Sequence, residues 1–431
     1  MSIIPMRWYR HRNGRDDKMV AIILGGVVPH IELIEDLKKR GYTTLLLDYL
    51  ENPPAKAYAD EFLRVSTLDR EAVLEIAMQR KADLIITICV DHANVTMCYV
   101  AEKLGLPLPY SYDTAIKTTD KGIMKQCMFD GGIPTSEFKL LYENDPLPED
   151  LEFPVVVKPV DNNGSKGVKR ANDRAELEKY VKAAFAFSRK GQVIVEEFSD
   201  GIEIQVDCFA NEGKAHVIMT RKKLEMPRKE GLALQSIGSV IPAPLKKEHI
   251  DEFRSIADKM VSVYDFEHTP FFFQAKLKGD KIKVLEVSPR IGGGLSYKML
   301  KSQMDFDVVD TIIDSYFGNV DSINIRPKEQ YMLTDIVYAG GGVFDHVEGA
   351  AQMIEEGVID SFDLMIDKGK DMGSDMDSRN RVGAYLITAA TKNDILKKAQ
   401  TAFENIAVID NEGHVMSRGD ICYKGEENEA S

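Results

Sequence analysis

The chain has no surplus of basic residues. Its 431 residues contain 55 lysines and arginines against 69 aspartates and glutamates, which gives a formal net charge of -14 at pH 7. Nucleic-acid binding needs a basic face that neutralises phosphates. The composition therefore argues against nucleic acid as the main partner, and an anionic ligand would need local basic pockets or metal ions.

Cysteine is scarce and carries no recognisable motif. The five cysteines form no CxxC pair and no spacing typical of metal ligands. Cys208 lies within an apolar strand pattern, so we expect a reduced, buried thiol at this position. Such cysteine usage is typical of a reducing compartment, and we expect a cytoplasmic location.

Long apolar runs are also missing. The first 18 residues are polar and lack the apolar core of a signal peptide. No later run is long enough to span a bilayer. We therefore expect residues 1–18 to form a polar leader, and we expect no membrane partner.

The first part of the chain alternates short apolar strands with helical segments. Residues 19–26 have the pattern of a buried strand that ends in glycines, residues 28–42 that of a helix, and residues 43–49 that of the next strand. This alternation predicts a parallel α/β sheet. The glycines do not form the GxGxxG fingerprint, so nicotinamide binding is not favoured.

The pattern changes beyond residue 116, where longer strands alternate in polarity and predict an antiparallel sheet with one solvated face. A third, mixed segment begins near Pro327, and the charged tail is expected to be disordered. The predicted layout is a leader (1–18), an α/β domain (19–116), a central α+β domain (117–325) with a small lid of about residues 135–198, a C-terminal α+β domain (326–424) and a tail (425–431).

The first segment that carries chemistry is KPVDNNGSKGVK, residues 158–169. Lys158 ends a strand, and the turn that follows is rich in glycine and asparagine. Glycines let backbone N–H groups approach an anion closely, and lysine adds a positive charge, as phosphate cradles require. Taken alone, an ordinary hairpin loop would explain these residues equally well.

The second segment is VIVEEFSDGIEIQV, residues 193–206. Glu196 and Glu197 end an apolar strand, and Glu203 follows them in the next apolar run. Such a strand end can present backbone groups to a flat base, and a carboxylate can accept hydrogen bonds from ribose hydroxyls. A solvated strand end is the alternative, and without further context it would be favoured.

The third segment reads as a β-hairpin over residues 271–290. It places Gln274 and Glu286 on paired strands, with Ser288 two residues beyond Glu286 and on the same face. Oxygen-bearing side chains in this arrangement suit a hard cation such as Mg²⁺, and Arg290 could clamp a phosphoryl group or a carboxylate. The alternative is a cross-strand polar pair followed by a turn arginine.

The fourth segment, residues 220–239, is a local exception to the acidic composition. A basic loop between strands could close over an anionic substrate, although a solvated loop explains the same charges. The segment contains the bases Arg221, Lys222, Lys223, Arg228 and Lys229 and the acids Glu225 and Glu230.

The order of these motifs resembles the ATP-grasp superfamily, in particular its carbamoyl-phosphate-synthetase-like and amino-acid-ligase-like members. The motifs TDK, VVVKP with a glycine loop, VEEF…GIE and a hairpin ending in EVSPR follow one another within about residues 20–325. The resemblance implies a Rossmann-like pre-ATP-grasp domain, an ATP-grasp fold of two α+β subdomains that clamp ATP, and a small C-terminal mixed α/β domain.

The resemblance also implies the nucleotide site. Lys121 and Lys158 would contact the phosphates of ATP, and Glu203 would bind the ribose. The glycine loop that would fold over the β- and γ-phosphates comprises Gly164, Ser165, Lys166 and Gly167, and the residues that would meet the adenine are Glu196, Glu197, Phe198 and Ser199.

In the same way the resemblance implies the reacting centre. Gln274 and Glu286 match the two metal-binding positions, and Arg290 matches the arginine that steadies the transferred phosphoryl group, so that Arg290 and Glu286 would be catalytic. Ser288, a further expected metal ligand, stands where asparagine is usual, and the first metal position is more often acidic, which leaves Glu286 as the strong anchor. The expected substrate-binding residues are Arg221, Lys223, Arg228, Gly292, Gly293 and Gly294.

The implied reaction uses ATP and Mg²⁺, with Mn²⁺ as a substitute. A substrate carboxylate takes the γ-phosphoryl group to give an acyl phosphate and ADP, and an amine, such as an amino acid, then displaces phosphate to form an amide-type bond. Positioning and charge stabilisation would supply the catalysis. A bicarbonate-using carboxylase or carbamoyl-phosphate-type enzyme and a catalytically weak ATP-binding regulatory protein are the alternatives, and the resemblance points to a homodimer.

Overall fold

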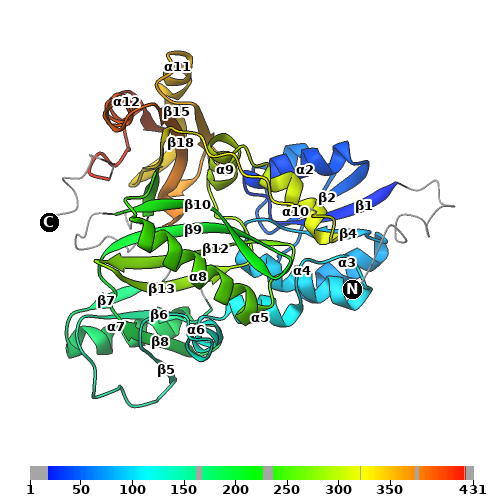
Figure 1. The fold of residues 1–431 in the computed structure, drawn as a ribbon. Coiled ribbons are helices and arrows are strands. Elements are labelled where there is room, and N and C mark those ends of the chain that lie inside the picture. Colours follow the sequence, from blue (N-terminus) through cyan, green and yellow to red (C-terminus); the bar gives the residue numbers. More distant parts are fainter. Residues whose placement is uncertain are drawn as a thin grey trace.

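The computed structural model describes residues 18–161, 167–226, 236–320, 322–373, 378–421 and 423. Within these ranges the strands form sheets of four, eight, three and four strands. The N-terminal elements (blue to cyan in Figure 1) lie on one side of the largest sheet, the small sheet that contains β5 to β8 lies below it, and the C-terminal elements lie above it. The predicted combination of α/β and α+β regions is confirmed.

The N-terminal unit is a parallel sheet in the order β3-β2-β1-β4. Helices pack against its faces, so residues 21–24 of β1 are fully buried, as expected for a parallel strand covered on both sides. The elements are β1 (Met19–Leu24), α2 (Pro29–Lys39), β2 (Tyr42–Asp48), η1 (Lys56–Tyr58), β3 (Glu61–Arg64), α3 (Arg70–Gln79), β4 (Leu84–Ile86) and α4 (Asp91–Leu104).

A small antiparallel sheet in the order β5-β8-β6-β7 follows in the chain. The helix α7 covers one of its faces and buries an apolar core between them. The elements that lead into this sheet and form it are α5 (Tyr112–Thr119), α6 (Lys121–Asp130), β5 (Phe138–Tyr142), β6 (Val155–Pro159), β7 (Lys169–Ala171), α7 (Arg174–Phe187) and β8 (Gln192–Glu197).

The largest sheet is antiparallel, in the order β13-β12-β9-β10-β11-β14-β18-β16. Side chains of a strand alternate between the two faces, and residues 204, 206, 208 and 210 of β9 pack with α8 in one core. The opposite face carries polar residues such as Gln205, Asp207 and Arg221, but these are buried, so the predicted solvated face is a covered polar face instead. The elements are β9 (Ile202–Asn211), β10 (Lys214–Glu225), β11 (Ser236–Ile241), α8 (Lys247–Tyr264), β12 (Thr269–Lys278), β13 (Lys281–Ser288), β14 (Tyr331–Tyr338), β16 (Ser361–Leu364) and β18 (Arg381–Ala389).

The C-terminal residues add three strands to this sheet and a separate three-stranded sheet in the order β17-β15-β19. Since β14, β16 and β18 continue the central sheet, the sheet itself does not separate the predicted central domain (117–325) from the predicted C-terminal domain (326–424). The domain boundaries therefore stay a prediction. The remaining elements are α9 (Ser296–Met304), α10 (Val308–Tyr316), β15 (Gly342–Glu348), α11 (Ala350–Glu355), β17 (Asp371–Met372), η2 (Ser378–Asn380), α12 (Lys392–Asn405) and β19 (Ala407–Asp410).

The N-terminal unit and the central sheet are joined by α9 and α10. Residues of these two helices belong to the same buried core as the N-terminal sheet, and Arg40 at the end of α2 forms ion pairs of 2.6 Å with Asp310 and Asp314 of α10. This packing holds the start of α4 close to the end of β13, which matters for the site below.

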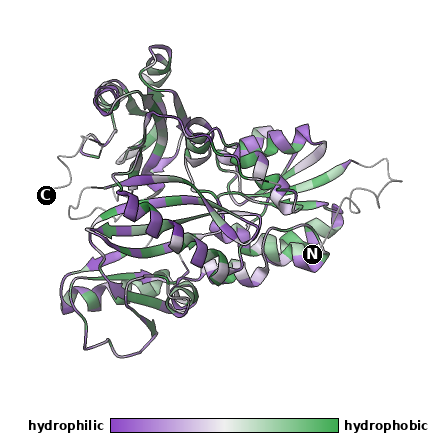
Figure 2. Ribbon diagram, viewed as in Figure 1, coloured by the Kyte–Doolittle hydropathy of each residue, from purple (hydrophilic) through white to green (hydrophobic). Residues whose placement is uncertain are grey.

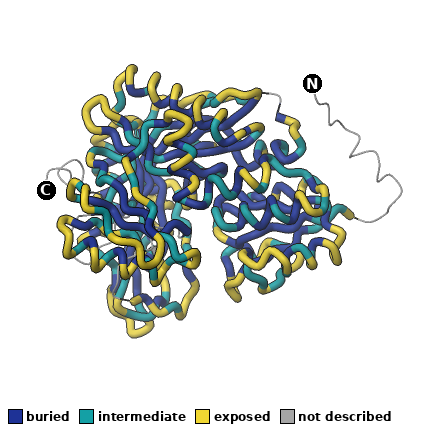
Figure 3. Tube along the Cα trace, turned by 90° about the horizontal axis from the view of Figure 1, so that it is seen from below, coloured by how far each residue is buried: buried dark blue, intermediate teal, exposed yellow. Residues whose placement is uncertain are grey.

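The distribution of apolar residues follows this architecture. Apolar segments (green in Figure 2) concentrate in the strands and on the helix faces that cover them. The buried stretches (dark blue in Figure 3) run through the middle of the sheets, and exposed residues gather at turns and outer helix faces. None of the helices in the described part of the chain combines the length and the apolar character needed to cross a membrane.

Candidate functional site

A cavity of about 480 Å³ lies where the small sheet, the polar face of the large sheet and the start of α4 meet. Two of the site residues predicted from the sequence, Gly167 and Ser288, do not line this cavity. Four others lie outside the described residues: Gly164, Ser165, Lys166 and Arg228. The predicted residues that do line it are Lys121, Lys158, Glu196, Glu197, Phe198, Ser199, Glu203, Arg221, Lys223, Gln274, Glu286, Arg290, Gly292, Gly293 and Gly294.

Strand register places one polar row across the floor of the cavity. Glu286 pairs with Gln274, Gln274 with Gln205, and Gln205 with Arg221. Because directly paired residues project from the same face of a sheet, the row runs across β13, β12, β9 and β10. The predicted pairing of Gln274 and Glu286 is confirmed, whereas Gln205 was not predicted.

A second row lies two residues further along the same strands. Glu203 pairs with Lys276 in the ladder, and the Lys276 ammonium lies 3.5 Å from the Glu203 carboxylate and also contacts Glu225. Lys223 projects from the same face of β10 as Arg221, two residues away. Lys276 and Glu225 were not predicted, although the period of two along β10 and β12 would have pointed to them.

A β-bulge in β13 aims Glu286 into the cavity. Gln274 pairs with Glu286 but Ala275 pairs with Val284, so Leu285 is the extra residue. Such a bulge bends a strand and changes the direction of its side chains, and Leu285 and Glu286 both line the cavity. Ser288 is buried and donates a hydrogen bond of 3.0 Å to Asp91, so its metal-binding role stays a prediction.

Two lysines converge on one buried carboxylate. Glu196 forms ion pairs with Lys158 (2.5 Å) and with Lys125 (3.2 Å). Burial opposes the charge of Glu196, but the two ammonium groups outweigh it and lower the pKa of its carboxyl to about 2. Glu196 therefore stays ionised and holds both lysines in place, a positioning role that was not predicted for it.

Lys125 does not line the cavity but contacts Glu196, which does, and it was not predicted. It lies one helical turn after Lys121 on α6, donates a hydrogen bond of 2.7 Å to Thr135, and is 1% exposed. Burial lowers its pKa to about 8, against the attraction of Glu196. The spacing i, i+4 in TDKGIMK is the signal that could have revealed it.

Arg290 is held by a carboxylate from the N-terminal unit. Its guanidinium contacts both oxygens of Asp91, with Nη2 2.5 Å from Oδ2, and lies over the Phe272 ring at 5.1 Å. In spite of burial, Arg290 keeps the pKa of Asp91 below its ordinary value. Asp91 was not predicted, although it follows a parallel strand, where ligands gather in α/β sheets.

Arg221 is locked in place beneath the glycine run. Its Nε lies 3.1 Å from Asp207, and its Nη2 donates a hydrogen bond of 2.7 Å to Ser296. A Cβ on Gly292 would lie 2.6 Å from the Ser296 hydroxyl and 2.8 Å from Arg221 Nη2. A side chain at position 292 would therefore displace the Ser296 hydroxyl or the Arg221 guanidinium from its place in the polar floor.

The donor set fits a hard cation at Gln274 and Glu286. Both residues offer oxygen atoms, and cross-strand partners have Cβ atoms about 5 Å apart. Elsewhere in the described residues, Glu32, Asp36 and Asp307 form an acidic cluster, but Lys39 and Lys301 neutralise it at 2.7 Å. As a cation site, the Gln274–Glu286 pair in the cavity is therefore favoured over this acidic cluster.

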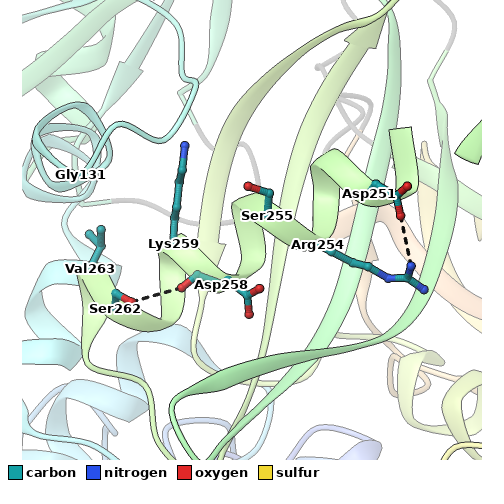
Figure 4. A pocket seen from close by; sticks show the side chains of 8 residues that line it. All are labelled: Gly131, Asp251, Arg254, Ser255, Asp258, Lys259, Ser262 and Val263. Carbon is teal, nitrogen blue, oxygen red and sulfur yellow. Dashed lines mark hydrogen bonds and ion pairs between the residues drawn. The ribbon is translucent and has the colours of Figure 1, made fainter. Parts of the chain in front are cut away.

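A shallow depression on the outer face of α8 has no such convergence. Figure 4 shows Gly131 and side chains of α8 around it. Arg254 pairs with Asp251 on the same helix at 3.3 Å, whereas Lys259 donates a hydrogen bond to the Gly132 carbonyl and Asp258 accepts one from the Ala215 amide. Because these polar groups already have partners within the protein, we assign no function to this surface.

Comparison with known proteins identifies the domain that contributes much of the cavity lining. Residues 151–298 match the family model of the ATP-grasp domain. A D-alanine--D-alanine ligase of Thermosipho africanus is 30% identical over 223 residues, covering 47% of this chain and 59% of that protein. A formate-dependent phosphoribosylglycinamide formyltransferase of Nitratiruptor sp. is 24% identical over 291 residues, covering 66% and 73%. The chain thus spans about three fifths of the first of these relatives.

Solved structures share the whole architecture. The L-amino acid ligase of Bacillus licheniformis superposes with a TM-score of 0.77 at 20% identity, covering 92% of this chain and 100% of that one. The phosphoribosylglycinamide synthetase of Anaerococcus prevotii gives a TM-score of 0.72 at 17% identity, with the same coverage. The family match confirms the resemblance predicted from the order of the motifs, and residues 151–298 form an ATP-grasp domain.

Proposed function

We propose that the protein is an ATP-dependent ligase that activates a substrate carboxylate as an acyl phosphate and then joins it to an amine. The observation that carries the proposal is the convergence, in one cavity, of the lysines of the small sheet and α6 with the Gln274–Glu286 pair and Arg290. The names of the relatives, among them D-alanine--D-alanine ligase and L-amino acid ligase, describe the same class of reaction.

The small sheet and the large sheet would hold ATP between them. Lys121 and Lys158 supply positive charge for the phosphates, and Glu196 keeps the Lys158 side chain extended toward the cavity. The segment of Phe198 and Ser199 connects β8 to β9 at the edge of the cavity, where backbone groups are available for the adenine. Related chains have been solved with ADP.

Gln274 and Glu286 would hold Mg²⁺, or Mn²⁺ in its place. When bound, the cation would neutralise the phosphate oxygens and bring the γ-phosphoryl group close to the carboxylate. The residues themselves contribute the oxygen donors on two paired strands. Lys121 faces Glu286, whose charge partly offsets the lowering of the Lys121 pKa by burial.

The chemistry proceeds in two displacements. A carboxylate oxygen of the substrate bonds to the γ-phosphorus while the bond to the β–γ bridging oxygen breaks, and ADP departs. The amine nitrogen then bonds to the acyl carbon, its proton is lost, and inorganic phosphate leaves. Arg290, fixed by Asp91, and the backbone of residues 292–294 face the anion that forms, and stabilisation by preorganised charges is the main catalytic term.

An ADP-release assay tests the proposal. We expect release that depends on a carboxylate, increases with a second amine, and is lost in Glu286→Gln, while Lys214→Gln, an exposed change on β10, leaves it unchanged. Release with bicarbonate and no amine would indicate the carboxylase alternative instead. Nucleotide binding without release under any condition would indicate a regulatory protein.

We also propose a cytoplasmic location and a homodimeric state. The cysteines Cys89, Cys98, Cys127 and Cys208 are free thiols, which agrees with a reducing compartment. A related biotin carboxylase domain was solved as a dimer. Sedimentation of the full chain at several concentrations tests the oligomeric state.

A further inference from the structure

The cavity has a second cationic region away from the metal pair. Lys223 on β10 pairs with Ser239, which pairs with Thr334, and all three line the cavity together with Arg381 of β18. β10 and β13 are three strands apart, so their backbones are separated by roughly 14 Å across the sheet, and Lys223 lies two residues further along β10 than Arg221, which is in register with Glu286. Lys223 therefore lies well away from the Gln274–Glu286 pair, beside which the substrate carboxylate would be activated.

The carboxylates near Lys223 are already engaged by other cations. Asp207 pairs with Arg221 at 3.1 Å, while Glu203 and Glu225 both contact Lys276. Within the described ranges, no carboxylate lies within ion-pair distance of Lys223; its electrostatic neighbours act on it only at longer range. Among the described residues, the Lys223 ammonium thus faces carboxylates that are paired with other cations and forms no ion pair of its own.

Two guanidinium groups strengthen the positive field at this position. Arg221 lies on the same face of the same strand, and Arg381 approaches from β18, where its Nε donates a hydrogen bond of 2.9 Å to the Tyr338 hydroxyl. Burial, aided by the two arginines, lowers the pKa of Lys223 to about 8. An anion bound here would relieve this repulsion, since an opposite charge favours the ammonium form.

We propose that Lys223 and Arg381 form an anion subsite that holds a second anionic group, carboxylate or phosphate, of one of the two substrates. The identity of the ligand as a substrate rests on the proposed ligase function, whereas the subsite itself rests on the geometry of the cavity. The subsite would make the enzyme select acidic or phosphorylated substrates over their neutral analogues, because a bound neutral analogue covers the ammonium without giving it an anion.

A binding measurement without turnover tests the subsite. Isothermal titration of the full chain at pH 7 compares L-glutamate with L-glutamine and O-phospho-L-serine with L-serine, in the absence of ATP. We expect tighter binding of the charged member of a pair, weakened about ten-fold or more by Lys223→Gln and restored by Lys223→Arg. Lys214→Gln, which removes an exposed charge from the same strand, is the matched control.

The outcomes separate the two kinds of anion. Selective binding of glutamate indicates a carboxylate subsite, and selective binding of phosphoserine indicates a phosphate subsite. Equal binding of charged and neutral members, or a Lys223→Gln protein that retains the wild-type preference, overturns the proposal. Lys223→Met provides a second neutral variant should the glutamine variant fail to fold.

The pH dependence of binding gives a readout that a structural role would not change. Charged-probe affinity should fall as pH rises through about 8 in the wild type and stay constant in Lys223→Arg, since arginine remains charged. The same loss in both proteins would contradict the assignment. The charged groups that face Lys223 are Glu203 and Asp207 on β9, Arg221 and Glu225 on β10, and Arg381 on β18.

The two proposals can fail separately. If ADP release is intact and Lys223→Gln changes neither binding nor the KM for the charged substrate, the subsite proposal is wrong and the ligase proposal stands. Selective anion binding without ADP release under any condition removes the ligase and keeps the subsite.

Discussion

Replacement of Glu196 by glutamine tests the electrostatic centre of the site. The change keeps the shape of the side chain but removes the charge that holds Lys125 and Lys158. The carboxyl has a pKa of about 2 in the folded protein against an ordinary value of 4.5. A difference of this size corresponds to about 3 kcal/mol of folding free energy, which agrees with the roughly 3–5 kcal/mol lost when one partner of a buried pair is removed.

The sign of the pH dependence follows from the lowered pKa. The stabilisation is fully present above the ordinary value of 4.5 and is lost as pH falls toward about 2. Urea unfolding should therefore show Glu196→Gln destabilised at pH 7, with the difference from the wild type shrinking below pH 4.5. Glu197→Gln is the matched control, because Glu197 is 43% exposed and its pair with Lys283 should contribute less than about 1 kcal/mol.

The same variant should weaken ATP binding, since Lys158 loses the carboxylate that positions it. Adding Lys125→Met to Glu196→Gln should recover part of the stability, because the second change removes a buried ammonium left without its partner. The reasoning would be refuted by a Glu196→Gln protein that unfolds like the wild type at pH 7, or by a loss of stability that persists unchanged at pH 3.

Three further predictions follow from neighbouring contacts. Asp91→Asn should lower kcat roughly ten-fold and change the KM for ATP less, because it loosens the charged contact that positions Arg290. Single-turnover ADP release measures the effect on the chemical step. Gly292→Ala should reduce activity by about ten-fold or more, since its Cβ would lie 2.6 Å from Ser296, and a thermal melt distinguishes this from unfolding. Burial raises the pKa of Asp335 to about 7 from 3.8. The protonated carboxyl therefore stabilises the folded state in full below pH 3.8, and this contribution is lost as pH rises through 7. Asp335→Asn removes the titration and should reduce the decline in stability between pH 4 and 7 by roughly 4 kcal/mol at most, as urea unfolding at each pH would show.

Local patterns were sufficient to predict the strands and the residues that project from them. The alternation along residues 271–290 placed Gln274 and Glu286 on paired strands, as the structure confirms. The parallel N-terminal sheet and the polar face of the central sheet followed from periodicity in the same way. These features depend on interactions between residues close in sequence or joined by one turn, so the sequence pattern is enough to reveal them.

Contacts between distant segments could not be predicted in this way. Asp91 meets Arg290 across 199 residues, and Lys125 meets Glu196 only because α6 packs beside the small sheet. The position of the bulge at Leu285 depends on register with β12, which no residue of β13 specifies alone. Neither Asp91 nor Glu196 belongs to a spacing motif that would reveal its partner.

The sequence by itself thus determined the elements, their exposed and buried faces and the order of the motifs, because side-chain periodicity is a local property of the backbone. Only the tertiary structure decided which charges face one another. Strand order brings Lys223 of β10 and Arg381 of β18 to one cavity, and the packing of α9 and α10 brings α4 to the end of β13. Charge pairing acts through space, so its partners depend on how the elements assemble.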